Sequence, residues 1–299
     1  MILKKNTSTE RAENMPAPGT RVGLRLGIPV AAAAVFGLIA ALLRCFLLFN
    51  CYNPQSGYYD AAEPGIVPYF MWLTVLLGLL LSVWTALRLS PVLANSSPFS
   101  TGISAVLPSL LMACVWIAVM FEQSSLRSSG TVNRNLAIVT AVFSVLAALV
   151  TLTDAVLPVS GIRYGRALAA LVPAAALVLL CFEVYFDETL VINCPNKPIF
   201  TLAACVCALF LVLRCRFFGT IPHPTLFAVS GLGVITLGLF SGVPGLVWFL
   251  VRRDALLIHV IFDILMIAFS LYTAVLLLTM RCGGNPPEAE KENETGSNA

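Results

Sequence analysis

The sequence predicts an all-α integral membrane protein with about eight transmembrane helices. Hydrophobic residues make up 59% of the 299 residues and charged residues only 11%, with a mean hydropathy of +0.90. A soluble domain carries about 25% charged residues, so this composition does not fit a water-soluble globule. The apolar runs also lack the alternation of β-barrel strands, and runs of about 20 residues suit helices that cross a bilayer.

Eight apolar segments follow one another along the chain, separated by short polar or proline-containing stretches. We expect helices over residues 27–49, 67–88, 103–121, 135–157, 167–186, 197–215, 224–250 and 255–280. Residues 1–25 and 282–299 are polar and irregular, which predicts a disordered tail at each end of the chain.

The distribution of lysine and arginine predicts the side of the membrane that each loop faces. With a cytoplasmic N-terminus, twelve basic residues fall on inside segments and five on outside segments, and Arg44 lies within a span. This excess follows the positive-inside rule, so we expect a multi-pass protein of the cytoplasmic membrane with both termini in the cytoplasm. Arg252 and Arg253 depart from the rule, because they fall in an outside loop.

The two halves of the chain share a weak pattern. Tyr-Tyr-Asp at 58–60 and Tyr-Phe-Asp at 185–187 are each followed by a proline that opens the next span. This offset predicts two parallel four-helix repeats, over residues 26–157 and 158–281. Alternatively, any two helical hairpins share such proline and arginine positions, and the sequence leaves both interpretations open.

Motifs of soluble enzymes are absent from the sequence. It contains no GxxxxGK, HExxH or GxSxG pattern, and its two histidines are too few for a histidine-based metal cage. No basic stripe supports nucleic-acid binding. We therefore expect a non-enzyme without cofactor, metal or nucleic acid, which contacts the lipid bilayer and an unknown small solute or ion. A homo-oligomer or a partner subunit stays open.

Ionisable residues at membrane depth are the functional candidates, because charges are costly to place in a membrane. Asp263 lies about 12 Å below the outer end of the last span, too deep for its short side chain to reach water. His259 lies one turn nearer the surface on the same face. Arg44 lies about 7 Å below the outer surface and is the natural partner of Asp263. The full set of candidate pathway residues in the outer third is Asp263, His259, Arg44, Glu183 and Glu122.

Each of these residues also has a structural explanation. Arg44 can extend its long side chain to the interface, and Glu122 and Glu183 can simply mark helix ends. Asp263 can form a structural pair with Arg44 or His259. Cys51 and Cys194 both fall in predicted outside loops, where a disulfide between them is compatible with an oxidising compartment.

The seventh span combines residues that favour close packing with one that disturbs a helix. Gly238 and Gly242 are four residues apart, a spacing that lets another helix backbone approach closely. Pro244 follows, and we expect it to kink or break the helix. Broken helices line the binding sites of many transporters, although proline and glycine are common in membrane helices generally.

The stretch "LLRCFLLFNCYNPQSGYYDAAEPGIVPYF" (42–70) resembles a segment of uncharacterised bacterial multi-pass membrane proteins. In these proteins a first helix ends in an aromatic-rich turn of the type x-[DN]-P-x-[ST]-G. Asn53, Pro54, Ser56 and Gly57 carry the match here, which covers about a tenth of the chain. The resemblance implies a bacterial cytoplasmic membrane and brings no activity, ligand or catalytic residue.

These observations predict a membrane protein with a polar pocket that opens to the outside. Our leading hypothesis is a small-solute or ion permease, or its membrane subunit, with Asp263, His259 and Arg44 lining the path. The alternative is a non-catalytic sensor, assembly factor or partner-binding scaffold, in which the same charges form structural pairs.

Overall fold

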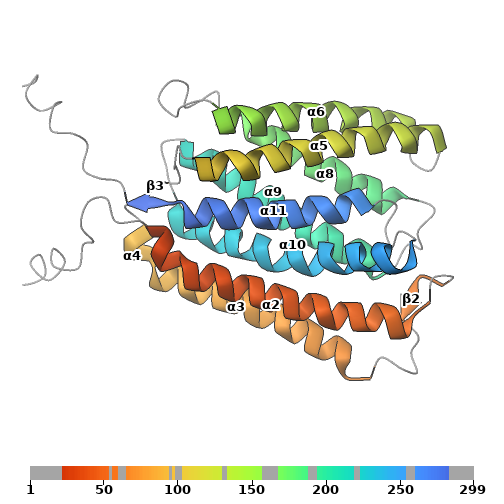
Figure 1. The fold of residues 1–299 in the computed structure, drawn as a ribbon, viewed down its shortest axis with the longest axis horizontal. Coiled ribbons are helices and arrows are strands. Elements are labelled where there is room, and N and C mark those ends of the chain that lie inside the picture. Colours follow the sequence, from red (N-terminus) through yellow and green to blue (C-terminus); the bar gives the residue numbers. More distant parts are fainter. Residues whose placement is uncertain are drawn as a thin grey trace, which may run out of the picture.

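The computed structural model describes most of the chain between residues 22 and 282. The described ranges are 22–53, 56–59, 65–93, 96–97, 103–129, 133–156, 168–187, 194–218, 223–253 and 260–282. Figure 1 shows that these residues form a bundle of long helices, which run side by side along the long axis of the molecule.

The long helices account for almost all of the described residues. They are α2 (Val22–Cys51), α3 (Val67–Arg88), α5 (Ile103–Ser129), α6 (Arg134–Val156), α8 (Leu171–Phe186), α9 (Asn196–Phe218), α10 (Pro224–Arg252) and α11 (Val260–Leu278). A short helix, α4, covers Ser90–Leu93. Two antiparallel pairs complete the fold: β1 (Tyr52–Asn53) with β2 (Tyr58–Tyr59), and β3 (Ser96–Ser97) with β4 (Arg281–Cys282).

The eight predicted spans correspond one to one with the eight long helices, so the predicted all-α membrane fold is confirmed. Seven helices within the described part are long and apolar enough to cross a membrane, and α8 is an apolar helix of 16 residues. Their outer faces are apolar, as Leu76, Leu80 and Trp84 on α3 illustrate with about half of each side chain exposed. Such a surface suits lipid, and the chain is a multi-pass membrane protein.

Several helix boundaries differ from the predicted ones: α2 begins at Val22, inside the predicted N-terminal tail, and the end of α5 has the clearest reason. Helix α5 continues to Ser129, well beyond the predicted end at residue 121. The added turns, from Glu122 onward, are polar, so a hydropathy window ends before the helix does. The described part of α11 begins at Val260, and residues 254–259 lie outside the described ranges.

Helix α10 is the centre of the bundle, where it packs against α2, α3, α9 and α11. Its glycines make this position possible. A Cβ atom on Gly238 or Gly242 would overlap with atoms of α11, including the carbonyl oxygens of Met266 and Asp263. The close approach predicted from the Gly238–Gly242 spacing is therefore confirmed, and α11 is the partner.

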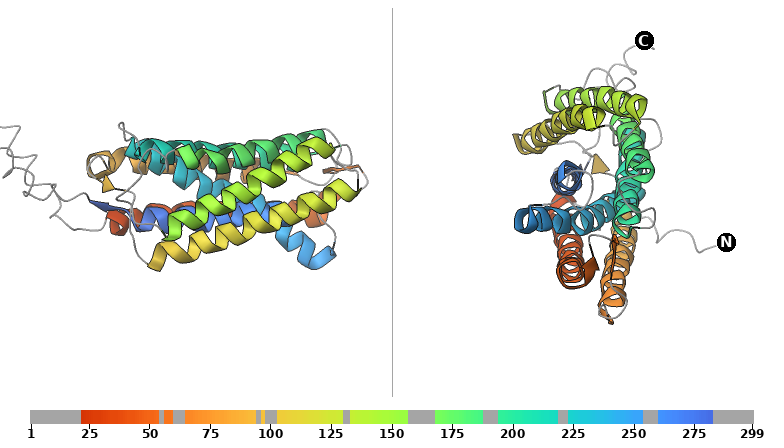
Figure 2. Two further views of the ribbon diagram at one scale, coloured as in Figure 1. Left: turned by 90° about the horizontal axis from the view of Figure 1, so that it is seen from above. Right: turned by 90° about the vertical axis from the view of Figure 1, so that its right-hand side faces the viewer.

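Two helical hairpins of the first half lie on opposite sides of the second half. Helices α2 and α3 pack on α10, whereas α5 packs on α11 and α6 packs on α8. Figure 2 shows this order end-on, with α10 and α11 between the two hairpins. The units predicted over residues 26–157 and 158–281 are thus interleaved in space, and the repeat itself stays a prediction.

The two ends of the bundle differ in what they carry. One end holds the β1–β2 pair, the C-terminal ends of α2, α5, α8 and α10, and the N-terminal ends of α3, α6, α9 and α11 (Figure 1). We call it the β1–β2 end. It corresponds to the face that the distribution of basic residues predicts to be outside.

Candidate functional site

Arg44 on α2 points into the protein near the β1–β2 end and is only 2% exposed. Its Nη1 atom donates to the carbonyl oxygens of Phe240 and Ser241, both at 3.0 Å, and its Nη2 atom donates to Asn196 Oδ1 at 2.8 Å. The guanidinium also lies 5.6 Å from the centre of the Phe240 ring. Arg44 therefore joins α2 to α9 and α10, and the alternative that it extends to the interface is wrong.

Pro244 explains why a carbonyl of α10 is free to bind Arg44. A residue in a helix donates its N–H to the carbonyl four positions earlier, and proline has no N–H to donate. Phe240, four positions before Pro244, therefore has a carbonyl oxygen without its helical donor, and Arg44 takes that place. Helix α10 continues through Pro244 to Arg252 and is not broken there.

Asp263 is also buried, with 2% exposure, in the first turn of α11. Its carboxylate lies against Gly245 of α10, so closely that a Cβ atom at this position would overlap with the carboxylate atoms. Within the described residues the carboxylate has neither a hydrogen bond nor an ion pair. Gly245 therefore makes room for an acid that has no protein partner there.

Arg44 and Asp263 lie close enough for their charges to interact, but these two described side chains form no direct ion pair. The expected direct pair is therefore not formed. The reason lies in α10: Arg44 donates to carbonyls at Phe240 and Ser241, whereas Asp263 rests against Gly245, one turn beyond Ser241.

Three further buried atoms around Arg44 lack hydrogen-bond partners within the described residues. They are Arg44 Nε, Asn196 Nδ2 and the Tyr59 hydroxyl. Burial raises the pKa of Tyr59, and the neighbouring Arg44 opposes this only partly through its charge and its hydrogen-bonding contact with the hydroxyl. The hydroxyl therefore keeps its proton at neutral pH, and this O–H can still be donated. Buried polar groups are normally paired, so these unpaired donors need an explanation. We call Arg44, Tyr59, Asn196 and Asp263 the Arg44 cluster.

A second buried acid joins other helices at the same end of the bundle. Glu183 on α8 is 0% exposed, and Gln123 on α5 donates its Nε2 to Glu183 Oε2 at 2.8 Å. Thr140 on α6 faces the same carboxylate. The oxygens Glu183 Oε1 and Gln123 Oε1 have no partner within the described residues. The interpretation of Glu183 as a simple helix end does not describe this interior position.

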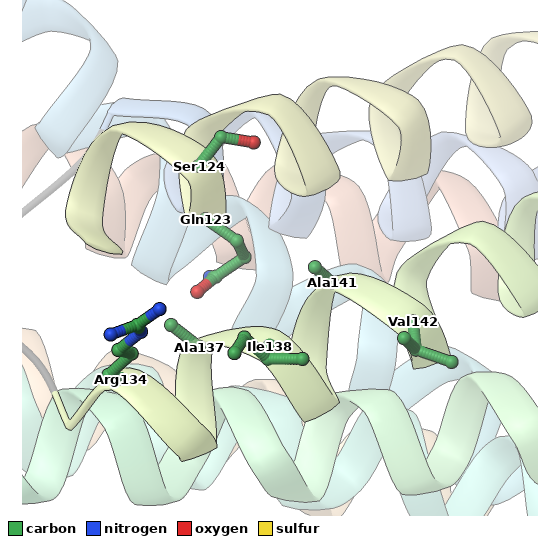
Figure 3. A pocket seen from close by; sticks show the side chains of 7 residues that line it. All are labelled: Gln123, Ser124, Arg134, Ala137, Ile138, Ala141 and Val142. Atoms are coloured by element: carbon green, nitrogen blue, oxygen red, sulfur yellow. The ribbon is translucent and has the colours of Figure 1, made fainter. Parts of the chain in front are cut away.

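A pocket of about 500 Å³ lies between α5 and α6, next to this second acid. Its lining residues are Gln123, Ser124, Arg134, Ala137, Ile138, Ala141 and Val142. Figure 3 shows the Arg134 guanidinium and the Gln123 amide turned toward each other at one end of the pocket. The apolar residues of α6 line the rest. The pocket is thus polar at one end and apolar along its length.

The predicted site residues divide between these two places. Arg44 and Asp263 belong to one cluster and Glu183 to the other, whereas Glu122 is half-buried beside Gln123. His259 lies outside the described residues. Sequence reasoning missed Asn196, Tyr59 and Gln123, because a search for charges at membrane depth passes over neutral polar side chains.

Cys51 and Cys194 both lie near Tyr59, and both are buried cysteines that take part in no disulfide. The disulfide that their predicted location allowed is therefore not formed in this structure.

Comparison with protein-family models, curated proteins and solved structures gives no match. The function has to be inferred from the chemistry of the chain itself.

Proposed function

We propose that this multi-pass membrane protein is a small-solute permease, or the membrane subunit of one, whose path includes the Arg44 cluster. One observation carries the proposal: Arg44 and Asp263 are buried beside the same two turns of α10 and do not pair directly. A buried charge without a partner is costly, and in membrane proteins such residues commonly mark the path of a substrate or ion.

The cluster has spare hydrogen-bonding capacity of both kinds. Within the part of the chain that the structure describes, Arg44 Nε, Asn196 Nδ2 and the Tyr59 hydroxyl are donors without an acceptor. The Asp263 carboxylate accepts no hydrogen bond from these described residues. A small zwitterion complements this set, because its carboxylate accepts from the donors and its ammonium group donates to Asp263. The net charge of the cluster is then balanced without an additional ion. We therefore propose an α-amino acid or a similar zwitterion as the solute.

Helix α10 offers a place where the cluster can rearrange. The carbonyl of Phe240 depends on Arg44 rather than on a helical N–H, and Gly245 adds flexibility one residue after Pro244. A solute carboxylate that binds the guanidinium competes with this carbonyl. Binding at Arg44 is thereby coupled to the conformation of α10 at the proline, as in transporters that bind substrate at interrupted helices.

We further propose that the protein resides in a bacterial cytoplasmic membrane with the β1–β2 end outside and both termini in the cytoplasm. The excess of basic residues on the opposite face supports this orientation. The resemblance of the stretch around Asn53 and Gly57 supports the bacterial membrane.

Uptake into proteoliposomes tests the proposal with radiolabelled glycine and alanine as probes. We expect time-dependent uptake by the wild-type protein and at least a tenfold loss in Asp263→Asn, which removes the charge but keeps the shape. Glu183→Gln is the matched control, since it changes another buried acid to its amide, and it should retain uptake. Absence of uptake in the wild type, or equal uptake in Asp263→Asn, contradicts the proposal.

The alternative function is a non-catalytic sensor, assembly factor or scaffold, and one observation favours it. The three hydrogen bonds of Arg44 join α2, α9 and α10, which is the arrangement expected of a structural contact. Under this alternative, Arg44→Ala and Asp263→Ala lower stability, neither probe is taken up, and the double variant loses no more stability than the worse single variant.

A further inference from the structure

We propose that the pocket between α5 and α6 binds one phospholipid with an anionic, hydroxyl-bearing headgroup, for which phosphatidylglycerol is the probe. This site is separate from the Arg44 cluster and does not depend on the proposed permease function. The inference rests on the residues at the polar end of the pocket, on its apolar wall and on its depth.

Arg134 supplies the positive charge at the polar end. It is the first residue of α6, is exposed, and turns its guanidinium toward the pocket (Figure 3). No acidic side chain forms an ion pair with Arg134 within the part of the chain that the structure describes. The positive end of the α6 dipole adds to its charge. A phosphate group fits this position because guanidinium binds phosphate oxygens with two parallel hydrogen bonds.

Gln123 supplies a hydrogen-bond acceptor beside that charge. It is 1% exposed, and its Nε2 donates to Glu183 Oε2 at 2.8 Å. This bond fixes the orientation of the amide, because a flipped amide would place its oxygen against the carboxylate. Its Oε1 atom has no partner within the described residues, although it is buried. A hydroxyl group of a bound headgroup can donate to this oxygen.

The wall below the polar end is apolar and follows one face of α6. Ala137 and Ala141 are four residues apart, as are Ile138 and Val142, so each pair lies one turn apart on the helix. From Arg134 to Val142 the helix rises about 12 Å, which matches the first part of an acyl chain. The small alanine side chains leave the space that the chain occupies.

The depth of these groups matches the profile of a lipid rather than that of a soluble solute. Arg134 begins α6 at the end of a span, where lipid headgroups lie, and the apolar wall extends from there into the span. A pocket of about 500 Å³ is smaller than a whole phospholipid. It therefore takes the headgroup and the upper part of one acyl chain.

The headgroup chemistry distinguishes this proposal from general contact with lipid. Both phosphatidylglycerol and phosphatidylcholine carry a phosphate for Arg134, but only the glycerol headgroup has hydroxyl donors for Gln123 Oε1. An unpaired buried acceptor costs free energy, so a headgroup that pairs it binds more tightly. We expect phosphatidylglycerol to bind about tenfold more tightly than phosphatidylcholine, the ratio that one such hydrogen bond produces.

Native mass spectrometry of the purified full-length protein in detergent tests the proposal, with palmitoyl-oleoyl phosphatidylglycerol and phosphatidylcholine added separately. We expect one preferred phosphatidylglycerol molecule per chain. Arg134→Gln should weaken both lipids about tenfold, whereas Gln123→Met should lower phosphatidylglycerol binding to the level of phosphatidylcholine. Arg88→Gln, at an exposed arginine near the opposite end of the bundle, is the matched control and should change neither affinity.

A third variant keeps the test valid if the buried Gln123 substitution prevents folding. Ala141→Phe fills the apolar part of the pocket without touching its polar end, and we expect it to reduce the binding of both lipids. Equal binding of the two lipids by the wild type overturns the proposal. Binding of several equivalent lipids that Arg134→Gln leaves unchanged also overturns it, since this result describes only a general lipid shell.

Discussion

Arg44 Nη1 on α2 lies 3.0 Å from the carbonyl oxygen of Phe240 on α10, the carbonyl that Pro244 leaves without a helical donor. A proline in one helix thus creates the acceptor for a buried cation of another helix. This relationship explains how a membrane protein can hold an arginine in its interior.

Pro244→Ala should stabilise the protein far less than a proline removal normally does. Replacing an interior proline by alanine usually gains about 3 kcal/mol in a helix. Here the new N–H competes with Arg44 for the Phe240 carbonyl, so the gain is offset by a weakened contact between α2 and α10. The free energy of unfolding in a detergent titration measures this, and a full gain would show that Arg44 does not depend on that carbonyl.

Gly245→Ala should destabilise the protein by about 1–3 kcal/mol, because its Cβ overlaps with the Asp263 carboxylate. In the double variant with Asp263→Gly the overlap is gone, so the effect of Gly245→Ala should largely disappear. Gly27→Ala is the matched control, since no atom lies within 4 Å of its Cβ position. Thermal unfolding of all four variants provides the measurement; additive effects would contradict the contact.

Arg44→Ala should lower the free energy of unfolding by about 3–5 kcal/mol, because it removes three hydrogen bonds and leaves Asp263 without the neighbouring charge. Arg44→Lys keeps the charge but not the forked geometry, so we expect an intermediate loss. Unfolding titrations compare the two. A loss below about 1 kcal/mol in Arg44→Ala would exclude a buried network.

Cysteine labelling should place the β1–β2 end outside. Ser56→Cys lies in the exposed turn between β1 and β2, and Arg216→Cys is exposed in the last turn of α9 at the opposite end. A membrane-impermeant maleimide should label the first variant in intact bacterial cells and the second only after permeabilisation. Native Cys51 and Cys194 are buried and should stay unreactive until the protein unfolds. The reverse labelling pattern would invert the orientation.

The fold could be predicted from the sequence because lipid imposes a simple rule. Each span must satisfy its own backbone hydrogen bonds, so a long apolar run is a helix whatever its neighbours are. The limit of this rule shows at α5, where polar residues after Phe121 continue the helix beyond the apolar run. Which helices pack together was not predictable, because contacts such as that of Gly242 with α11 depend on the shape of both partners.

The site could be predicted only in part. The cost of buried charge identified Arg44, Asp263 and Glu183, and all three are indeed buried near the same end of the bundle. Their partners could not be predicted, since Arg44 binds backbone carbonyls and Asn196 rather than an acid. A sequence does not show which backbone carbonyls are free to accept a hydrogen bond, except that Pro244 indicates a free carbonyl at Phe240. This indication predicts a contact with Arg44 only once α2 and α10 are known to be neighbours.

The central claim, that the Arg44 cluster binds a zwitterion, is tested most directly by equilibrium binding of radiolabelled glycine to the purified protein. Unlabelled alanine should compete, whereas acetate and methylamine, which each carry one of the two charges, should compete at least tenfold more weakly. Asp263→Asn should lose binding and Glu183→Gln should keep it. Equal competition by acetate, or no glycine binding by a folded wild-type protein, would contradict the account.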